Sequence, residues 1–289
     1  SFGNPHGMTK KIDVAVVGAT GVVGQAMLEI LAERKFPVGK IHALASERSV
    51  GKTVEFGNRE LAVCDLAEFD FSTVQIGLFS AGGSISAEFA PKAVAAGCVV
   101  IDNTSHFRYD DDIPLVVPEV NPDAIADREA RGIIANPNCS TIQMVVALKP
   151  IYDAVGIERI NVATYQSVSG AGRDAMNELV RQTSQLMNGR PLEIDGDAKQ
   201  IAFNAVPHID SFQDNGYTRE EMKLVWETRK IFDNPDIQVN RTCVRIPVFY
   251  GHSDAVHLES VDRLSAGVAR ALLVAAAGGW GVVGGAGGG

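Results

Sequence analysis

Apolar residues in the first half of the chain gather in short runs that alternate with amphipathic stretches. The run 12–17 leads through three glycines into a stretch whose Met27, Leu28 and Leu31 share one helical face, which predicts a strand followed by a helix. Further apolar runs predict three strands, at 40–45, 74–79 and 99–101. The stretch 85–96 predicts a helix that ends at Gly97. Strands that alternate with helices predict a parallel, doubly wound sheet.

From Gly156 onward the pattern changes. Residues 157–173 alternate with period two, 173–188 have helical spacing, and 241–260 contain at least one more strand. This second half predicts a mixed-sheet α+β domain, with the boundary near Asn136. We therefore expect domains at 8–135 and 136–260, followed by an atypical, partly glycine-rich segment at 261–289 whose last twelve residues predict no packed element.

Composition limits the classes of function. A chain of 289 residues with 46% hydrophobic and 21% charged residues is typical of a two-domain soluble globular protein. The net charge of -9 and pI of about 5.2 provide no basic surface for nucleic acid or a membrane, so an anionic substrate must be held by a few arginines and lysines. The four cysteines are scattered without metal-binding spacing, which predicts reduced thiols, a cytoplasmic location and no metal.

A glycine motif, "GATGVVG" at 18–24, lies between the first predicted strand and helix. Small residues there let the backbone approach a pyrophosphate at a helix N-terminus, although a plain tight turn is the alternative. The candidate dinucleotide contacts are Gly18, Thr20, Gly21, Val22 and Val23.

Two further turns fit the same cleft. About 20 residues on, where an NAD site places an acid, "ASERS" offers Ser46, Arg48 and Ser49 to a 2′-phosphate, which favours NADP. Glu47 is the opposing signal, because it would favour NAD if it pointed inward. The turn "SAGGS" follows another predicted strand, and its candidates are Ser80 and Gly82, with an ordinary turn as the alternative.

Cys139 lies in "NPNCSTIQ", a bend followed by an apolar run of helical spacing that Ser140 or Thr141 could cap. At a helix N-terminus the dipole and free N–H groups stabilise a thiolate. The alternative is a small buried cysteine that happens to follow a turn. The residue alone does not decide between them.

Other polar residues have equally plain alternatives. Gln166 ends an apolar stripe and precedes the glycine-rich "SGAGR", which suggests close approach by a ligand, but loop backbone could also satisfy it. His252 could be a structural histidine or a group that titrates near neutral pH. Glu220 and Lys223 have i, i+3 spacing, which also fits a surface ion pair.

The motifs taken together carry a resemblance. In chain order they are "GATGVVG", "LFSAGGS", "DNTSHFR", "VVPEVN", "NPNCST", "TYQSVSGAG", "EEMK", "ETRKI" and "VRIPVFYGHS". From Lys11 to Glu259 the chain resembles aspartate-β-semialdehyde dehydrogenase. The resemblance implies a Rossmann-like α/β domain with a second, catalytic and dimerisation domain. It also implies NADP-dependent and phosphate-dependent interconversion of L-aspartate β-semialdehyde and β-aspartyl phosphate, in lysine, threonine and methionine biosynthesis, by a homodimer or homotetramer.

The family pattern assigns a role to each matching position. It makes Cys139 the nucleophile, Gln166 the group that orients the intermediate, and His252 the general acid/base. It further implies a substrate site made of Arg245 for the α-carboxylate, Glu220 for the amino group, Lys223 and Arg108 for phosphate, and Asn138 in the same pocket, and it adds Ser169 and Gly170 to the cofactor contacts. The chemistry agrees, since a thiolate is both a good nucleophile and a fair leaving group, and arginine grips a carboxylate with two parallel bonds.

Three rival interpretations remain at this point. N-acetyl-γ-glutamyl-phosphate reductase and glyceraldehyde-3-phosphate dehydrogenase share the thioester strategy. A non-catalytic NADP-binding paralogue is the alternative from another class, and it is disfavoured because Cys139, Gln166 and His252 are all present.

Overall fold

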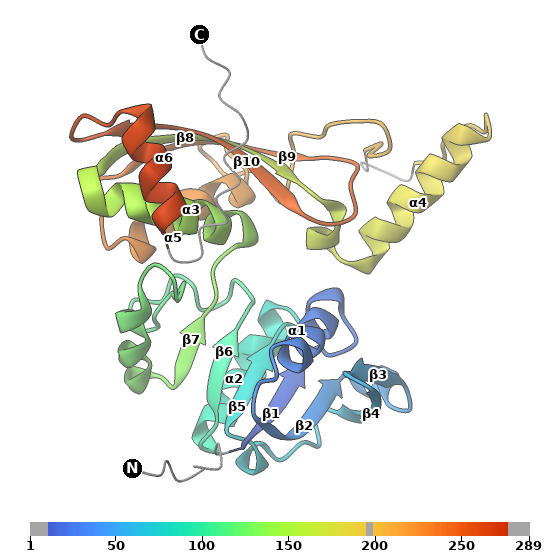
Figure 1. Cartoon of the computed structure of the whole chain (residues 1–289). Helices are drawn as coiled ribbons and strands as arrows, with labels where there is room; N and C mark the ends of the chain where they lie inside the picture. Colours follow the sequence, from blue (N-terminus) through green and yellow to red (C-terminus); the bar gives the residue numbers. More distant parts are fainter. Residues whose placement is uncertain (1–10, 195–198, 277–289) are drawn as a thin grey trace, which may run out of the picture. The chain divides into compact units, whose positions relative to one another are not determined.

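The computed structural model describes residues 11–194 and 199–276, and the glycine-rich end at 277–289 lies outside them. The chain forms two compact units (Figure 1). Unit 1 contains the chain up to Pro114 together with 126–136, and unit 2 contains 115–125 and the chain from Pro137 onward. The segment 115–125, which the sequence grouped with the first domain, belongs to unit 2; it carries buried apolar side chains such as Val117 and Val120.

Unit 1 is built on a seven-stranded sheet of order β3-β4-β2-β1-β5-β6-β7. All neighbouring strands are parallel except β3 and β4. The strands are β1 (Ile12–Val17), β2 (Val38–Ala45), β3 (Thr53–Phe56), β4 (Arg59–Asp65), β5 (Ile76–Phe79), β6 (Val99–Asp102) and β7 (Ile133–Ala135), and the helices are α1 (Val22–Glu33) and α2 (Gly83–Ala95). The predicted doubly wound α/β fold is confirmed.

The centre of this sheet is apolar because helices and neighbouring strands remove it from water. Val14 to Val17 of β1 are buried, and Val14 and Val16 pack with Leu28 of α1 and with Ala43 and Ala45 of β2. Central parallel strands have this continuous apolar character. The sequence prediction of β1, β2 and β6 rested on it.

The antiparallel hairpin of β3 and β4 was not predicted. Only Val54 and Val63 of its two strands are buried, and charged residues fill many of the remaining positions. Gly57, with a φ of 57°, supplies the turn between the strands. The weak apolar signal follows from the position of β3 at the edge of the sheet.

Unit 2 contains a three-stranded sheet of order β10-β8-β9, in which β8 is antiparallel to β10 and parallel to β9. The mixed sheet is as predicted. The strands are β8 (Ile157–Gln166), β9 (Gln238–Arg245) and β10 (His252–Ser260), and the helices are α3 (Cys139–Val155), α4 (Arg173–Met187), α5 (Arg219–Ile231) and α6 (Ala266–Ala275).

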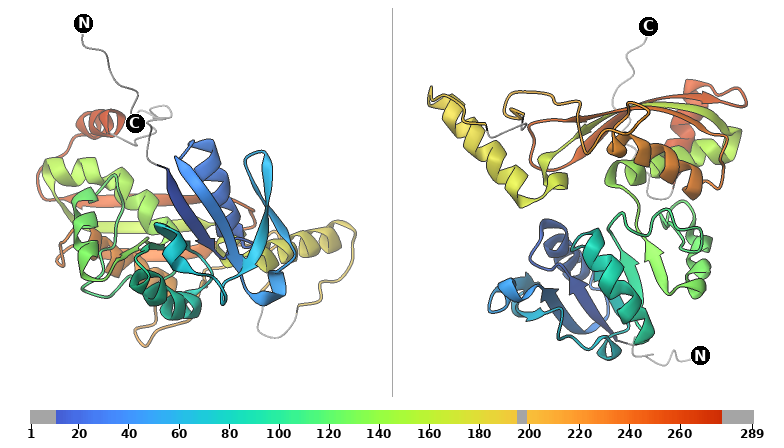
Figure 2. Two further views of the ribbon diagram at one scale, coloured as in Figure 1. Left: turned by 90° about the horizontal axis from the view of Figure 1, so that it is seen from below. Right: turned by 180° about the vertical axis from the view of Figure 1, so that it is seen from behind.

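The two faces of this sheet differ. Helix α3 contacts β8 and β10, and α5 contacts β9, so these two helices cover one face (Figures 1 and 2). Along β10 the other face presents Ser253, Ala255 and His257, all exposed, and Tyr165 lies opposite Ser253 on β8. Unit 2 therefore has one packed and one open sheet face. Among the described residues, no helix combines the length and the apolar character needed to cross a membrane.

Candidate active site

The glycine turn in unit 1 joins β1 to the N-terminus of α1. Gly18 has a φ of 85°, and a Cβ there would come within 2.9 Å of the Ser80 and Ala81 backbone. A Cβ on Gly24 would overlap the Gly18 carbonyl oxygen. Gly21 is the N-cap of α1, with Thr20 before it and Val22 and Val23 in the first turn. These glycines therefore permit the close packing of strand, turn and helix N-terminus that is typical of a pyrophosphate-binding turn.

The candidate 2′-phosphate residues follow β2, the strand next to β1. Ser46 is the N-cap of a 3₁₀ turn formed by Glu47, Arg48 and Ser49. Ser46, Glu47 and Arg48 are all exposed, so the turn leaves an arginine and a glutamate equally available.

The second glycine turn follows β5. Ser80 donates its hydroxyl to the Val17 carbonyl at 3.2 Å, which ties this turn to the end of β1. Gly82 caps α2 with a φ of 97°, and a Cβ there would meet nothing within 4 Å. The two turns therefore line the carboxyl ends of adjacent parallel strands, the usual ligand edge of such a sheet.

Arg108 also belongs to unit 1 and is 6% exposed. Its Nη2 donates to the Asn103 carbonyl at 2.9 Å, and the Asn103 side chain accepts from Asn136 Nδ2 at 2.7 Å. The preceding residue, Asp102, is fully buried and accepts hydrogen bonds from Ser86 and Thr104. Arg108 is thus held by Asn103, which follows β6, and Asn103 is held in turn by Asn136, which follows β7.

Cys139 is the first residue of α3 and is exposed. The helix is capped by Asn138, whose Oδ1 accepts from the Ser140 and Thr141 amides at 3.0 and 3.4 Å. The prediction that Ser140 or Thr141 would be the cap was wrong, because both already lie in the first turn and act as donors. The prediction that Cys139 sits at a helix N-terminus is correct.

Gln166, Arg245 and His252 lie in one row across the sheet of unit 2. Gln166 pairs with His252 on the antiparallel side and with Arg245 on the parallel side. Residues paired in this way project to the same face. The register therefore brings together three candidates that are widely separated in the chain.

Asn138, the residue before Cys139, and Gln166 of this row both donate to Glu220 Oε1. Burial lowers the pKa of Arg245 below its ordinary value, and the charges of Glu220 and Cys139 act in the opposite direction. A Cβ on Gly170 would lie 3.3 Å from Arg245 Nη1 and 3.6 Å from His252 Nε2. Gly170 and its neighbour Ser169 thus belong to unit 2, beside the guanidinium and the imidazole.

Glu220 and Lys223 form a buried ion pair at 2.8 Å, with side chains 8% and 13% exposed. The surface-pair alternative is excluded by this burial. Glu220 Oε1 also accepts from Gln166 Nε2 and Asn138 Nδ2, each at 3.0 Å, and Lys223 also donates to Asp210.

The pair keeps both charges. Burial alone would raise the pKa of Glu220, but Lys223 and the two amides lower it below its usual value. Burial alone would lower the pKa of Lys223, but Glu220 and Asp210 raise it above its usual value. Unit 2 therefore holds a fixed carboxylate and a fixed ammonium next to the row of strand residues.

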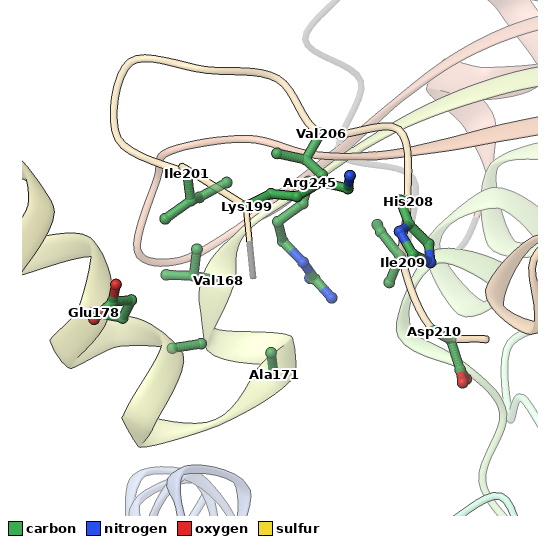
Figure 3. Close-up of a pocket in the computed structure, with 11 residues that line it drawn as sticks. Val168, Ala171, Glu178, Lys199, Ile201, Val206, His208, Ile209, Asp210 and Arg245 are labelled. Carbon is green, nitrogen blue, oxygen red and sulfur yellow. The ribbon is translucent and has the colours of Figure 1, made fainter. Parts of the chain in front are cut away.

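A cavity of about 350 Å³ opens beside Arg245. Figure 3 shows Val168, Ile201 and Glu178 on one side of the cavity and His208, Ile209 and Asp210 on the other, with Arg245 between them. The cavity lies entirely within unit 2. It suits a small charged molecule with a short carbon skeleton.

Comparison with known proteins defines the family. Residues 13–128 match the model "Semialdehyde dehydrogenase, NAD binding domain", and 148–283 match "Semialdehyde dehydrogenase, dimerisation domain". An aspartate-semialdehyde dehydrogenase of Legionella pneumophila is 66% identical over 94% of this chain and 78% of that protein. Another, aspartate-semialdehyde dehydrogenase 2 of Vibrio cholerae, is 65% identical over 88% of this chain and 75% of that protein.

The chain belongs to the aspartate-semialdehyde dehydrogenase family. A crystal structure of the Vibrio cholerae enzyme II, described as complexed with ASA, matches with a TM-score of 0.91 and 62% identity over 93% of this chain and 80% of that one. The Candida albicans enzyme, described with NADP, matches with a TM-score of 0.68 and 26% identity over 91% of this chain and 76% of that one. Membership identifies the chain as an oxidoreductase with aspartate-semialdehyde dehydrogenase activity and a nicotinamide-dinucleotide-binding domain.

Two residues of this family member escaped sequence reasoning. Glu227, fully buried on α5, accepts from the Asn138 backbone N–H at 2.6 Å and so fixes the residue before Cys139. Ser167, also fully buried, contacts both His252 and Arg245. Glu227 lies in the quoted "ETRKI" motif, and its spacing of seven from Glu220 on one helix face was the available signal. Among the described residues, no group of three or more histidine, cysteine, aspartate or glutamate side chains is arranged to hold a metal.

Proposed function

We propose that the chain catalyses the reversible, NADP-dependent and phosphate-dependent conversion of L-aspartate β-semialdehyde to β-aspartyl phosphate through a thioester on Cys139. The observation that carries this proposal is the meeting, in unit 2, of a helix-N-terminal cysteine with Arg245 and with the strand row that contains Gln166 and His252. A cysteine, an imidazole and a buried arginine suit acyl transfer to or from a small carboxylic acid.

Four candidate residues of unit 2 have distinct roles in this reaction. Cys139 attacks the carbonyl carbon, and the amides at the start of α3 favour its thiolate. Gln166 orients the acyl intermediate, and His252 provides acid–base chemistry at the carbonyl oxygen. Asn138 holds the bend through its cap and its bond to Glu220.

The substrate is bound by fixed charges. Arg245 receives the α-carboxylate, and the Glu220 carboxylate receives the α-ammonium group. Lys223 of unit 2 and Arg108 of unit 1 are each proposed as a phosphate ligand. Arg245 donates its Nη1 to the Ser167 carbonyl at 2.6 Å, which holds the guanidinium in place for the substrate.

The glycine turn fits a dinucleotide site, since a Cβ on Gly18 or Gly24 would collide with neighbouring backbone, and such close packing of strand, turn and helix is typical of a dinucleotide-binding turn. The contacts proposed in unit 1 are Gly18, Thr20, Gly21, Val22 and Val23 for the pyrophosphate, Ser46, Arg48 and Ser49 for the 2′-phosphate, and Ser80 and Gly82; those proposed in unit 2 are Ser169 and Gly170. When bound, NADP supplies the hydride acceptor. Arg48 supports NADP because a guanidinium can bind a 2′-phosphate, whereas the equally exposed Glu47 would favour NAD.

The assembly proposed is a homodimer, or a homotetramer built from it, in the cytoplasm, serving lysine, threonine and methionine biosynthesis. The open face of the β10-β8-β9 sheet, with Tyr165 and Ala255 exposed on it, is the surface that a second copy would cover. The matched dimerisation domain, which covers residues 148–283, supports self-association.

The test is NADPH formation from L-aspartate β-semialdehyde with and without phosphate. Turnover should require phosphate, disappear in Cys139→Ala and persist in the matched control Cys64→Ala, which removes an exposed cysteine on β4 of unit 1. Retained turnover in Cys139→Ala with phosphate present would refute the thioester route. NADP binding by Cys139→Ala, measured by calorimetry, shows that the loss arises from chemistry.

A further inference from the structure

Ser167, the residue that follows β8, contacts two functional side chains at once. Its backbone N–H donates to His252 Nδ1 at 3.1 Å, and its carbonyl accepts from Arg245 Nη1 at 2.6 Å. Its hydroxyl lies 3.2 Å from His252 Nδ1 and 2.9 Å from the Ser169 hydroxyl. One fully buried residue therefore orients both the imidazole and the guanidinium.

The backbone contact determines where the imidazole proton lies. An amide N–H can only donate, so the ring nitrogen that faces it must present a lone pair. A neutral imidazole has one N–H, and a hydrogen bond accepted by Nδ1 leaves that proton on Nε2.

The Nε2 atom of the ring lies on the side of Gly170 and the Arg245 guanidinium. A Cβ on Gly170 would lie 3.6 Å from Nε2 and 3.3 Å from Arg245 Nη1, so the glycine keeps this edge open beside the guanidinium. The charged groups around the ring are Arg245 of β9 and Asp254 of β10, and Cys139 and Glu220 act on Arg245 from α3 and α5.

We propose that Ser167 is a positioning residue whose backbone amide fixes neutral His252 as the Nε2–H tautomer, so that the ring donates a hydrogen bond to the reacting carbonyl oxygen instead of taking the proton of Cys139. The inference rests on the proposed function for the identity of that oxygen. For the attack step it assigns His252 hydrogen-bond donation in place of proton transfer.

The charges balance without proton transfer to the ring. Attack by the Cys139 thiolate forms the carbon–sulfur bond, and the carbonyl π pair moves to oxygen. The resulting oxyanion accepts the Nε2–H hydrogen bond, and no proton leaves His252. A preorganised donor at such an oxyanion typically accounts for a factor of about 100 to 1,000 in kcat.

The first test reads the tautomer directly. Protein labelled with ¹⁵N-histidine is examined by long-range ¹H–¹⁵N correlation above the ordinary titration range of histidine, and the His252 signals are assigned by their loss in His252→Gln. The expected result is a protonated Nε2 and a bare Nδ1, with His208 and His257 as internal references. A proton on Nδ1 would overturn the proposal.

Ser167→Ala separates the amide from the hydroxyl. This variant keeps the backbone N–H, so the Nε2–H signature should remain; a switch to Nδ1–H would show that the hydroxyl sets the tautomer and would overturn the role of the amide. The wild-type spectrum tests the proposal even if this buried variant does not fold.

The second test distinguishes a His252 that donates a hydrogen bond from a His252 that acts as a general base. The amide of a glutamine reaches toward the position of Nε2, whereas that of an asparagine stays near Nδ1. A donor role predicts that His252→Gln keeps at least about tenfold more kcat than His252→Asn, and equal losses would contradict it. The tautomer is read without turnover, so an absence of NADPH formation would refute the proposed function and leave the tautomer result standing.

Discussion

Replacing Asn138 by aspartate places a second carboxylate against Glu220 while leaving the helix cap in place. The introduced aspartate would still cap α3, since aspartate and asparagine are comparable N-caps. The Nδ2 donor, now 3.0 Å from Glu220 Oε1, becomes an oxygen. Everything else in the bend keeps its shape, so the change isolates one contact between α3 and α5.

The magnitude follows from that distance. Two unit charges 3.0 Å apart repel by about 5 kcal/mol at an effective dielectric constant of about 20. The protein can avoid this repulsion if one of the two carboxyl groups stays protonated. Protonation costs about 1.4 kcal/mol for each pH unit above about 4. Protonating one carboxyl group therefore costs about 1.4 kcal/mol at about pH 5 and about 5 kcal/mol at about pH 8. Lys223 on the other oxygen of Glu220 offsets part of the repulsion.

We therefore expect Asn138→Asp to lower the free energy of unfolding by about 2 to 4 kcal/mol at about pH 8 and by about 1 kcal/mol at about pH 5. The sign follows from linkage: a carboxyl whose folded-state pKa is raised binds more protons in the folded state. Stability relative to wild type is thus lost as pH rises from the unfolded-state pKa through the raised one. Urea unfolding at fixed protein concentration measures the difference.

Asn138→Ser is the matched control, because serine also caps but adds no charge. The free energy of unfolding of Asn138→Ser should fall only slightly below that of the wild type, and by the same amount at both pH values. If Asn138→Asp and Asn138→Ser lost equal stability at both pH values, the inferred contact between Asn138 and Glu220 would be refuted.

Three further predictions concern other parts of the site. Burial raises the pKa of Cys243 to about 12, so a thiol reagent at about pH 8 should modify exposed Cys139 far faster, and equal rates by mass spectrometry would contradict this. Arg245→Lys should lower kcat/KM about 100-fold with a much smaller change in stability, because lysine lacks the second parallel N–H; unchanged kinetics would remove the carboxylate role. Lys223→Met should cost about 3 kcal/mol of stability at neutral pH, with the loss shrinking in acid, where the Glu220 carboxylate of both proteins gains its proton; a loss that does not depend on pH would argue against a charge effect.

The local features of the fold could be predicted from the sequence because they depend on residues close together in the chain. The run 12–17 with its glycine turn, and the bend before Cys139, each carry their signal within about ten residues. The choice of Asn138 as the cap was missed because serine, threonine and asparagine are all good caps, and only backbone geometry decides among them.

The remaining features depend on contacts between distant residues. Glu227 accepts the Asn138 amide across 89 residues of sequence, and no spacing rule connects them. The row of Gln166, Arg245 and His252 requires the strand register, which periodicity alone does not specify. The resemblance indicated these residues as a set, and the register shows how the chain assembles them.

Because the row of Gln166, Arg245 and His252 spans three strands, recovery of turnover after unfolding reports when those strands have paired. Strands β8 and β9 pair in parallel, and Ser167 meets Arg245 across 78 residues of sequence. Closing such a long connection is slow compared with forming α3 or α5. A chain that has regained its helices but not this pairing has no functional row. Recovery of activity should therefore lag behind recovery of the helical circular dichroism signal, and it should follow the arrival of β9 beside β8.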